Sequence, residues 1–373
     1  MIRKRLKYIL KKAPNPFKIL KVYIKGKLGW LGIPIIVPYA AYANNEYVFI
    51  KGAVIEDKGL AKPDQKHKLW KNILTTLKRY SGDEIVGVRV SISYNDQNTI
   101  VTTDERGIFQ SLIKTKGTSN LDTRQDKACF SLIDKLSAEQ GDIRAEIPIQ
   151  RVLPGARFII VSDIDDTVMV SHSTKILKKL RLMLFKNAYT RSPFAGVSAF
   201  YNALARDNSV VNPIFYVSSS EWNLYDLLKD FFKFKRLPPG TLLLSDKKLR
   251  LLRFWRSGKK HDDKMSNIQM LFGFYPDHNF ILIGDSGQRD PEIYLQLAEM
   301  FPSRIKAIYI RCIGKKTGHE RMNTLIAEAK VLDTEMILVH NTVEAARHAA
   351  EKSYINKDRL DDIEAGKIID AHE

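Results

Sequence analysis

Seven polar residues in the second half of the chain are of types that could carry out chemistry together. Six of them follow three short apolar runs, at 158–161, 214–217 and 280–283, and the seventh opens a helical pattern just before the third run. Because the carboxyl ends of parallel strands meet at one edge of a sheet, we expect residues that follow such runs to lie close together. The seven residues are Asp163, Asp165, Thr167, Ser218, Lys264, Asp285 and Asp290.

The paired carboxylates favour metal-assisted phosphoryl transfer to an aspartate. Asp163 can attack phosphorus, which divides one difficult displacement into two easier ones. Since two anions must meet, a divalent cation has to bridge the nucleophile and the phosphate. Asp165 can protonate the leaving oxygen and later activate water. We expect Asp163, Asp165 and Asp285 to surround one Mg²⁺ ion, which prefers oxygen ligands.

The remaining candidates are expected to support these carboxylates. Thr167 could hold the turn after the first run through local hydrogen bonds. Ser218 and Lys264 would hold the phosphoryl oxygens as charge develops, and Asp290 would orient Lys264 or a metal-bound water. Mg²⁺ and Lys264 should keep Asp163 ionised, whereas an Asp165 turned away from the metal could hold a proton.

The elements that position these residues form an alternating pattern of apolar runs and helical stretches. Near-continuous apolar runs are typical of parallel strands buried on both faces, and the helical stretches between them supply the crossovers. The fold class predicted for residues 151–352 is therefore α/β, with a doubly wound parallel sheet. The expected strands cover 158–161, 214–217, 242–244, 280–283, 307–310 and 336–339, and the expected helices 221–235, 263–272, 291–300 and 341–352.

The rest of the chain has a different character. Residues 31–150 contain short runs rich in β-branched and aromatic residues, with a helical pattern at 66–79 and no catalytic constellation. They are predicted to form a smaller, β-rich, sandwich-like domain that precedes the α/β domain. Residues 1–30 are predicted to be a basic amphipathic arm, and residues 353–373 a C-terminal tail.

The charge of the chain is its most informative bulk property. Sixty Lys and Arg residues against 42 Asp and Glu give a net charge of +18, and residues 1–45 hold ten basic and no acidic residues. Such a balance points to anionic partners: nucleic acid, an anionic membrane or a phosphorylated substrate. The arm could lie on lipid, pack on the body or contact nucleic acid.

Composition excludes several protein classes. A hydrophobic content of 44% excludes a disordered chain, and no apolar stretch is long enough for a spanning helix. Two cysteines are too few for a disulfide scaffold or a cysteine-based zinc site, and they fit a reducing compartment. A calcium loop of the EF-hand type is disfavoured, since Val168 stands where such a loop has glycine.

The motifs, in their order along the chain, resemble the haloacid dehalogenase superfamily of phosphohydrolases. Longer strings look like the actin-patch-associated phosphatidate phosphatase family and its bacterial relatives: SDIDDT at 162–167, YVSSSEW at 216–222, LPPG at 237–240 and GDSGQRDPEIY at 284–294. The resemblance implies a haloacid dehalogenase-like phosphatase domain over 151–352. It departs from the family at Glu221, where proline often precedes the tryptophan.

The resemblance also implies an activity and assigns roles in it. The activity is Mg²⁺-dependent conversion of phosphatidate to diacylglycerol and phosphate. Asp163 would be the nucleophile and Asp165 the acid and base. The other motif residues would be Ser218, Lys264, Asp285 and Asp290.

Three basic segments mix cations with large apolar residues, which suits an interface where lipid headgroups meet acyl chains. They are 1–28, 174–186 and 247–260. We therefore expect a lipid phosphate substrate at an anionic phospholipid membrane, and peripheral attachment from the cytoplasmic side. Two alternatives stay open: a phosphatase acting on nucleic-acid ends or another soluble phosphomonoester, and a catalytically inactive lipid-binding protein.

Overall fold

The computed structural model describes residues 16–57, 83–115, 126–137, 140–164, 196–207, 210–246, 261–312 and 319–372. The predicted helix at 66–79 and the basic segments at 174–186 and 247–260 lie outside these residues, as do Asp165 and Thr167. The chain divides into two compact units. The β unit comprises Met1–Arg151, Glu221–Leu228 and Ser245–Leu249, and the α/β unit comprises the rest. Among the described residues, no helix has the length and apolar character needed to span a membrane.

A six-stranded parallel sheet forms the centre of the α/β unit, in the order β13-β12-β9-β14-β15-β16. Its strands, in chain order, are β9 (Ile159–Asp163), β12 (Ile214–Glu221), β13 (Thr241–Ser245), β14 (Phe280–Asp285), β15 (Ile305–Arg311) and β16 (Met336–Val339). Both neighbours of β9 run parallel to it. The strand order reverses between β9 and β14, and ligands of open α/β sheets bind at such a switch point.

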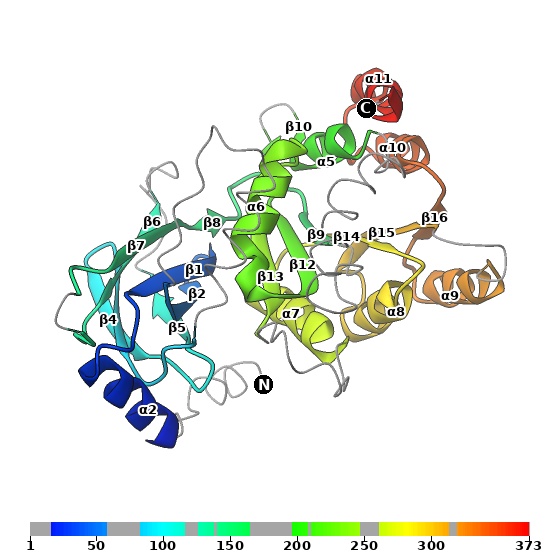
Figure 1. The fold of residues 1–373 in the computed structure, drawn as a ribbon. Helices are drawn as coiled ribbons and strands as arrows, with labels where there is room; N and C mark the ends of the chain where they lie inside the picture. The colour runs from blue at the N-terminus through cyan, green and yellow to red at the C-terminus, as the bar shows by residue number, and fades with distance from the viewer. Residues whose placement is uncertain are drawn as a thin grey trace. The chain divides into compact units, whose positions relative to one another are not determined.

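Helices cover both faces of this sheet. Figure 1 shows α5 (Val197–Ala205), α10 (Thr342–Glu351) and α11 (Arg359–His372) on one face, and α7 (His261–Phe274), α8 (Asp290–Met300) and α9 (His319–Val331) on the other. Burial on two sides explains why the strands are continuously apolar: Ile160, Val161 and Leu282 are fully buried. The predicted doubly wound α/β fold is confirmed.

Some elements differ from the prediction. The helix expected over 221–235 begins later, because β12 runs to Glu221 and a 3₁₀ turn (Trp222–Leu224) precedes α6 (Tyr225–Phe234). Helices α5, α9 and α11 were not predicted. The segment expected to be a tail contains α11, which buries Ile363 completely and packs against α5 and α10. A short antiparallel pair, β10 (Arg206–Asp207) and β11 (Val210–Val211), follows α5.

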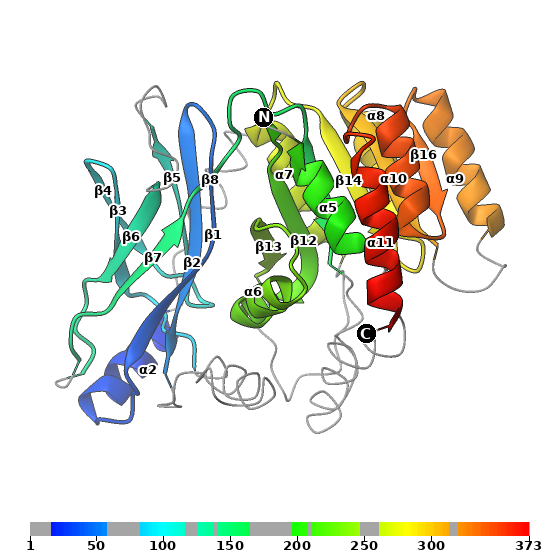
Figure 2. The same cartoon turned by 90° about the horizontal axis from the view of Figure 1, so that it is seen from above.

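Two four-stranded sheets form the β unit, in the orders β5-β2-β1-β8 and β4-β3-β6-β7 (Figure 2). The strands are β1 (Pro34–Ala43), β2 (Tyr47–Glu56), β3 (Arg89–Tyr94), β4 (Gln97–Thr102), β5 (Ile108–Lys114), β6 (Lys127–Leu132), β7 (Arg144–Pro148) and β8 (Gln150–Arg151). Side chains from both sheets share one core, including Val48 and Ile50 from one sheet and Ile92 and Phe130 from the other. The predicted β-rich, sandwich-like architecture is confirmed.

The turn at 103–107 connects the two sheets of the β unit. The strands on its two sides do not pair with each other, since β4 pairs with β3 and β5 with β2. The side chain of Asp104 holds the turn by accepting from the amides of Arg106 at 2.8 Å and Ile108 at 3.0 Å. Gly107 has φ +69°, and a Cβ there would lie 2.7 Å from the carbonyl oxygen of Val54. Glycine is therefore required at this crossover.

Candidate active site

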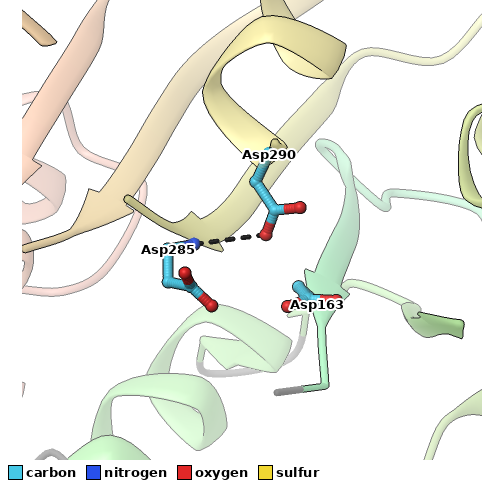
Figure 3. A group of neighbouring side chains, drawn as sticks. All are labelled: Asp163, Asp285 and Asp290. Atoms are coloured by element: carbon cyan, nitrogen blue, oxygen red, sulfur yellow. Dashed lines mark hydrogen bonds between the residues drawn. The ribbon is translucent and has the colours of Figure 1, made fainter. Parts of the chain in front are cut away.

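Three carboxylates meet at the switch point of the parallel sheet (Figure 3). Asp163 ends β9, Asp285 ends the adjacent strand β14, and Asp290 begins α8. One carboxylate oxygen from each lies within 4.8 Å of the others. The structure thus places Asp163 and Asp285 as close together as the sequence prediction required. It adds Asp290 to the same cluster.

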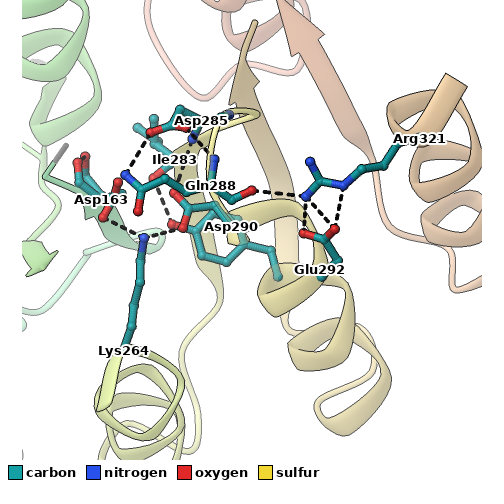
Figure 4. Close-up of polar contacts among 11 residues, drawn as sticks. Asp163, Lys264, Ile283, Asp285, Gln288, Asp290, Glu292 and Arg321 are labelled. Atoms are coloured by element: carbon teal, nitrogen blue, oxygen red, sulfur yellow. Dashed lines mark hydrogen bonds and ion pairs between the residues drawn. The ribbon is translucent and has the colours of Figure 1, made fainter. Parts of the chain in front are cut away.

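Lys264, on α7, pairs with two of these carboxylates. Its Nζ lies 2.6 Å from Oδ1 of Asp163 and also makes a close contact with Oδ1 of Asp290 (Figure 4). The lysine side chain is only 2% exposed. Burial acts to lower its pKa, but Asp163 and Asp290 together outweigh burial, so the pKa is raised and the lysine stays charged.

The pKa of Asp163 is raised well above its usual range. Burial is the largest cause and the negative charge of Asp290 the next, while Lys264 acts in the opposite direction. Lys264 contacts two of the three carboxylates, and the cluster holds more negative charge than this one ammonium group can balance. A divalent cation fits this donor set, because carboxylate oxygens are the ligands that Mg²⁺ prefers.

The loop after β14 holds Asp285 through backbone amides. Oδ1 of Asp285 accepts from the amide of Gly287 at 2.8 Å and from that of Gln288 at 3.1 Å. The amide of Asp285 in turn donates to Oδ2 of Asp290 at 3.2 Å. Gly284 makes this approach possible, since a Cβ there would lie 2.5 Å from Oδ2 of Asp290. The close approach of Asp290 therefore explains why glycine precedes Asp285 at the end of the strand.

Arg321, on α9, contacts this loop from outside and was not predicted from the sequence. Its guanidinium donates to the carbonyl oxygen of Gln288 at 3.0 Å (Figure 4) and to that of Ser286 at 3.3 Å. Its Nε donates to Glu292 on α8 at 2.6 Å. The loop that holds Asp285 is thereby tied to two helices. Sequence reasoning missed Arg321 because it lies in a helix, far from any strand end.

Ser218 lies at the same sheet edge as the carboxylates. Its neighbour Val217 pairs with Asp163 across β12 and β9, and the Ser218 side chain is buried. Tyr201 on α5 also supports this edge: its hydroxyl lies 2.8 Å from Oγ of Ser162, which donates to the carbonyl oxygen of Asp163. Burial raises the pKa of Tyr201 to about 12, so its hydroxyl stays protonated. No sequence motif marks Tyr201.

Comparisons with known proteins bear on the α/β unit. Residues 158–312 match the family model described as "Phosphatidate phosphatase APP1, catalytic domain". This segment contains all the candidate residues. Phosphatidate phosphatase APP1 of Saccharomyces cerevisiae is 32% identical over 194 residues, which cover 50% of this chain and 32% of that protein. An uncharacterized protein of Schizosaccharomyces pombe is 28% identical over 178 residues, which cover 47% of this chain and 28% of that protein.

These matches span about a third of the length of the curated relatives. Among solved structures, a carbohydrate acetylesterase from Xanthomonas citri aligns with a TM-score of 0.31 and 8% identity, covering 82% of this chain and 69% of that one. That likeness is too low to carry an argument. The sequence matches confirm the resemblance predicted from the motifs: across residues 158–312, this chain is similar to the phosphatidate phosphatase APP1 family.

Proposed function

We propose that this protein is a Mg²⁺-dependent phosphatase that converts phosphatidate to diacylglycerol and phosphate through an aspartyl-phosphate intermediate on Asp163. The observation that carries the proposal is the buried cluster of Asp163, Asp285, Asp290 and Lys264 at the switch point. The similarity to a protein named phosphatidate phosphatase supports the choice of substrate.

In the first step, an oxygen of Asp163 bonds to phosphorus and the bond from phosphorus to the lipid oxygen breaks. Lys264 contributes by stabilising the ionised form of Asp163, from which its Nζ lies 2.6 Å away. Its second contact, with Asp290, fixes the direction of the ammonium group. We assign to Lys264 and Ser218 the role of holding phosphoryl oxygens as charge develops. We assign protonation of the leaving oxygen to Asp165.

In the second step, water attacks the phosphoryl group, and the bond between phosphorus and Asp163 breaks. Asp165 would accept the proton of that water, so it returns to the state in which it began. Asp163, Asp165 and Asp285 are the residues proposed to hold Mg²⁺, with Asp290 beside Asp163 and Asp285. When bound, the cation would offset the repulsion between the carboxylates and the phosphate.

We further propose that the protein acts peripherally at the cytoplasmic face of a membrane. Phosphatidate carries acyl chains, so its phosphate is presented at a lipid surface. Support comes from the net charge of +18, because anionic lipids of the cytoplasmic leaflet attract basic proteins.

A phosphate-release screen tests this function. Phosphatidate in mixed micelles, 5′- and 3′-phosphorylated oligonucleotides and a sugar phosphate are each incubated with and without Mg²⁺. We expect release from phosphatidate only with Mg²⁺, and a loss of at least about 10³-fold in Asp163→Asn. Asp277→Asn, which changes an exposed carboxylate in the turn after α7, is the matched control and should retain activity.

Other outcomes would contradict the proposal. Faster release from the oligonucleotides would make the protein a nucleic-acid-end phosphatase. An absence of Mg²⁺-dependent release from every substrate, together with retained lipid binding, would make it an inactive lipid-binding protein. Acid-quenched enzyme should carry labelled phosphate that hydroxylamine removes, and a lack of label in wild type during turnover would argue against an aspartyl-phosphate.

A further inference from the structure

Helix α2 (Pro16–Lys27) has apolar residues on two opposite faces. One face packs on the β unit, with Val22 and Gly26 buried. Ile19 lies so close to Gly87 that a Cβ on that glycine would be 2.6 Å from Cγ1 of the isoleucine. A Cβ on Gly26 would clash with the carbonyl of Leu136. This face needs no further partner.

The opposite face of α2 is exposed. Phe17, Leu20, Ile24 and Leu28 recur at i, i+3, i+7 and i+11, so they line one side of the helix. Phe17 is 81% exposed, and Trp30, just beyond the helix, is 70% exposed. We call these five residues the apolar stripe. Large exposed apolar surfaces on soluble proteins mark interaction sites for protein or membrane.

The lysines of α2 divide into two pairs. Lys18 and Lys25 are used within the β unit: Lys18 donates to the carbonyl oxygen of Glu105 at 2.9 Å, and Lys25 pairs with Asp83 at 2.6 Å. Lys21 and Lys27 fall on the two sides of the apolar stripe in a helix of 3.6 residues per turn. Lys27 lies over the ring of Tyr23, 4.9 Å from its centroid. The stripe therefore has a cation on each flank, and α2 contains no acidic residue.

We propose that the apolar stripe docks on an anionic phospholipid surface, with Phe17, Leu20 and Ile24 at the boundary between headgroups and acyl chains. Lys21 and Lys27 then meet lipid phosphates, and Trp30 lies at headgroup depth, where indole rings are favoured. The two flanking cations and the net charge of +18 favour anionic lipid over a protein partner. This inference rests on the proposed function only in taking the substrate to be a membrane lipid.

Vesicle sedimentation of the full chain tests the docking surface. The vesicles contain phosphatidylcholine with or without phosphatidylserine, and no phosphatidate, so pelleting does not depend on the active site. We expect the double variant Leu20→Gln/Ile24→Gln to bind phosphatidylserine vesicles about tenfold more weakly than wild type. Ile100→Gln, which removes an exposed apolar side chain from β4, is the matched control and should bind like wild type.

The flanking lysines have a test of their own. Lys21→Gln/Lys27→Gln should weaken binding by about fivefold per lysine at low salt, and the loss should shrink as salt screens the charges. Lys306→Gln/Lys330→Gln, on β15 and α9, removes two exposed lysines elsewhere and is the control. An equal loss in both double variants would mean that net charge alone drives binding, which would overturn the assignment of these lysines.

Two further measurements ask how deeply Trp30 enters the membrane and whether lipid or a second copy of the chain covers the apolar stripe. Brominated acyl chains should quench the fluorescence of wild type more than that of Trp30→Phe. Equal quenching, or stripe variants that bind vesicles like wild type, would refute docking. A dimer that Leu20→Gln/Ile24→Gln converts to monomer, with vesicle binding unchanged, would assign the stripe to a second copy.

Hydrolysis of a short-chain, soluble phosphatidate should be the same in the stripe variant and in wild type. Loss of docking with this hydrolysis intact would overturn only the inference about α2. If wild type docks on the vesicles but does not hydrolyse the soluble phosphatidate, only the proposed function is overturned.

Discussion

At the scale of single residues, Asp163 carries a conflict between stability and chemistry. Burial and the charge of Asp290 raise its pKa, so the ionised form that a nucleophile requires is costly in the folded protein without a cation. Between the ordinary carboxyl pKa and the raised value, the folded protein holds a proton that the unfolded chain has released. Stability is therefore lost as the pH rises through that range.

Asp163→Asn is expected to stabilise the metal-free protein at neutral pH, by about 2–5 °C in Tm. The amide resembles the protonated acid and does not ionise, so the gain should grow as the pH rises and disappear in acid, where wild type is protonated. Thermal unfolding of both proteins in a chelator, at several pH values, measures this difference.

Repeating the thermal unfolding of wild type and Asp163→Asn with Mg²⁺ gives an internal control. Saturating Mg²⁺ should stabilise wild type more than Asp163→Asn, because the variant lacks one of the proposed ligand charges. Asp277→Asn should track wild type in both conditions. An Asp163→Asn variant that is less stable than metal-free wild type at neutral pH would show that the pairing with Lys264 outweighs burial.

At the scale of elements, the strands and the residues that follow them were the predictable part of the site. Six apolar runs identified the strands, because burial on both sheet faces leaves a signal in composition. Asp163 and Asp285 were expected together because each follows such a run. Asp290 was assigned a supporting role, although the first turn of α8 carries it into the carboxylate cluster.

Residues on helices were less predictable. Tyr201 and Arg321 act on the site through partners distant in sequence, Ser162 and the loop after β14. Helix α9 buries Met322, Leu325 and Ala329, half-buries Ile326 and exposes most of its other described residues, so its apolar pattern is weak in comparison with the strands. Such contacts depend on how helices pack, which no single local pattern records.

Arg321 links helix α9 to the loop that holds Asp285, so its loss should affect metal binding. It connects α9 to α8 through Glu292 and to the loop whose amides hold Asp285. Arg321→Gln should loosen that loop and weaken Mg²⁺ binding by about tenfold, as expected for a residue that orients a metal ligand without touching the metal. Direct titration with Mg²⁺ by calorimetry measures the effect independently of turnover.

A matched control separates this effect from the loss of any surface ion pair. Arg347 on α10 pairs with Glu364 on α11 at 2.9 Å, away from the loop, so Arg347→Gln should bind Mg²⁺ like wild type. Arg321→Lys should restore binding only in part, since one ammonium cannot reproduce the planar fork of guanidinium donors. Equal affinities in Arg321→Gln and Arg347→Gln would remove Arg321 from the site.

At the scale of the whole molecule, the β unit is not continuous in sequence. Besides residues 1–151 it includes Glu221–Leu228 and Ser245–Leu249. Within the unit, the buried rings of Trp222 and Tyr39 stack with centroids 5.9 Å apart and planes inclined by 17°. Asp246 pairs with Lys51 and, at 3.5 Å, with Arg106. A domain boundary placed near residue 150 therefore assigns parts of the β unit's core to the other fragment.

A fragment of residues 1–151 is accordingly expected to be much less stable than the same residues in the full chain. It lacks Trp222, so Tyr39 loses a stacking partner and apolar surface becomes exposed. Circular dichroism melting and binding of a hydrophobic dye measure the two consequences, and co-expression of residues 152–373 should reverse both.

In the full chain, Trp222→Ala should lower the free energy of unfolding by about 3–5 kcal/mol, because it opens a cavity in a packed core. Trp30→Ala, at an exposed position, should change it by less than about 0.5 kcal/mol. If the fragment instead melts cooperatively at the temperature of the full chain, and Trp222→Ala costs no more than Trp30→Ala, residues 1–151 fold on their own. The boundary predicted at residues 150 and 151 would then be a true domain boundary, and the two later segments would contribute nothing to the stability of the β unit.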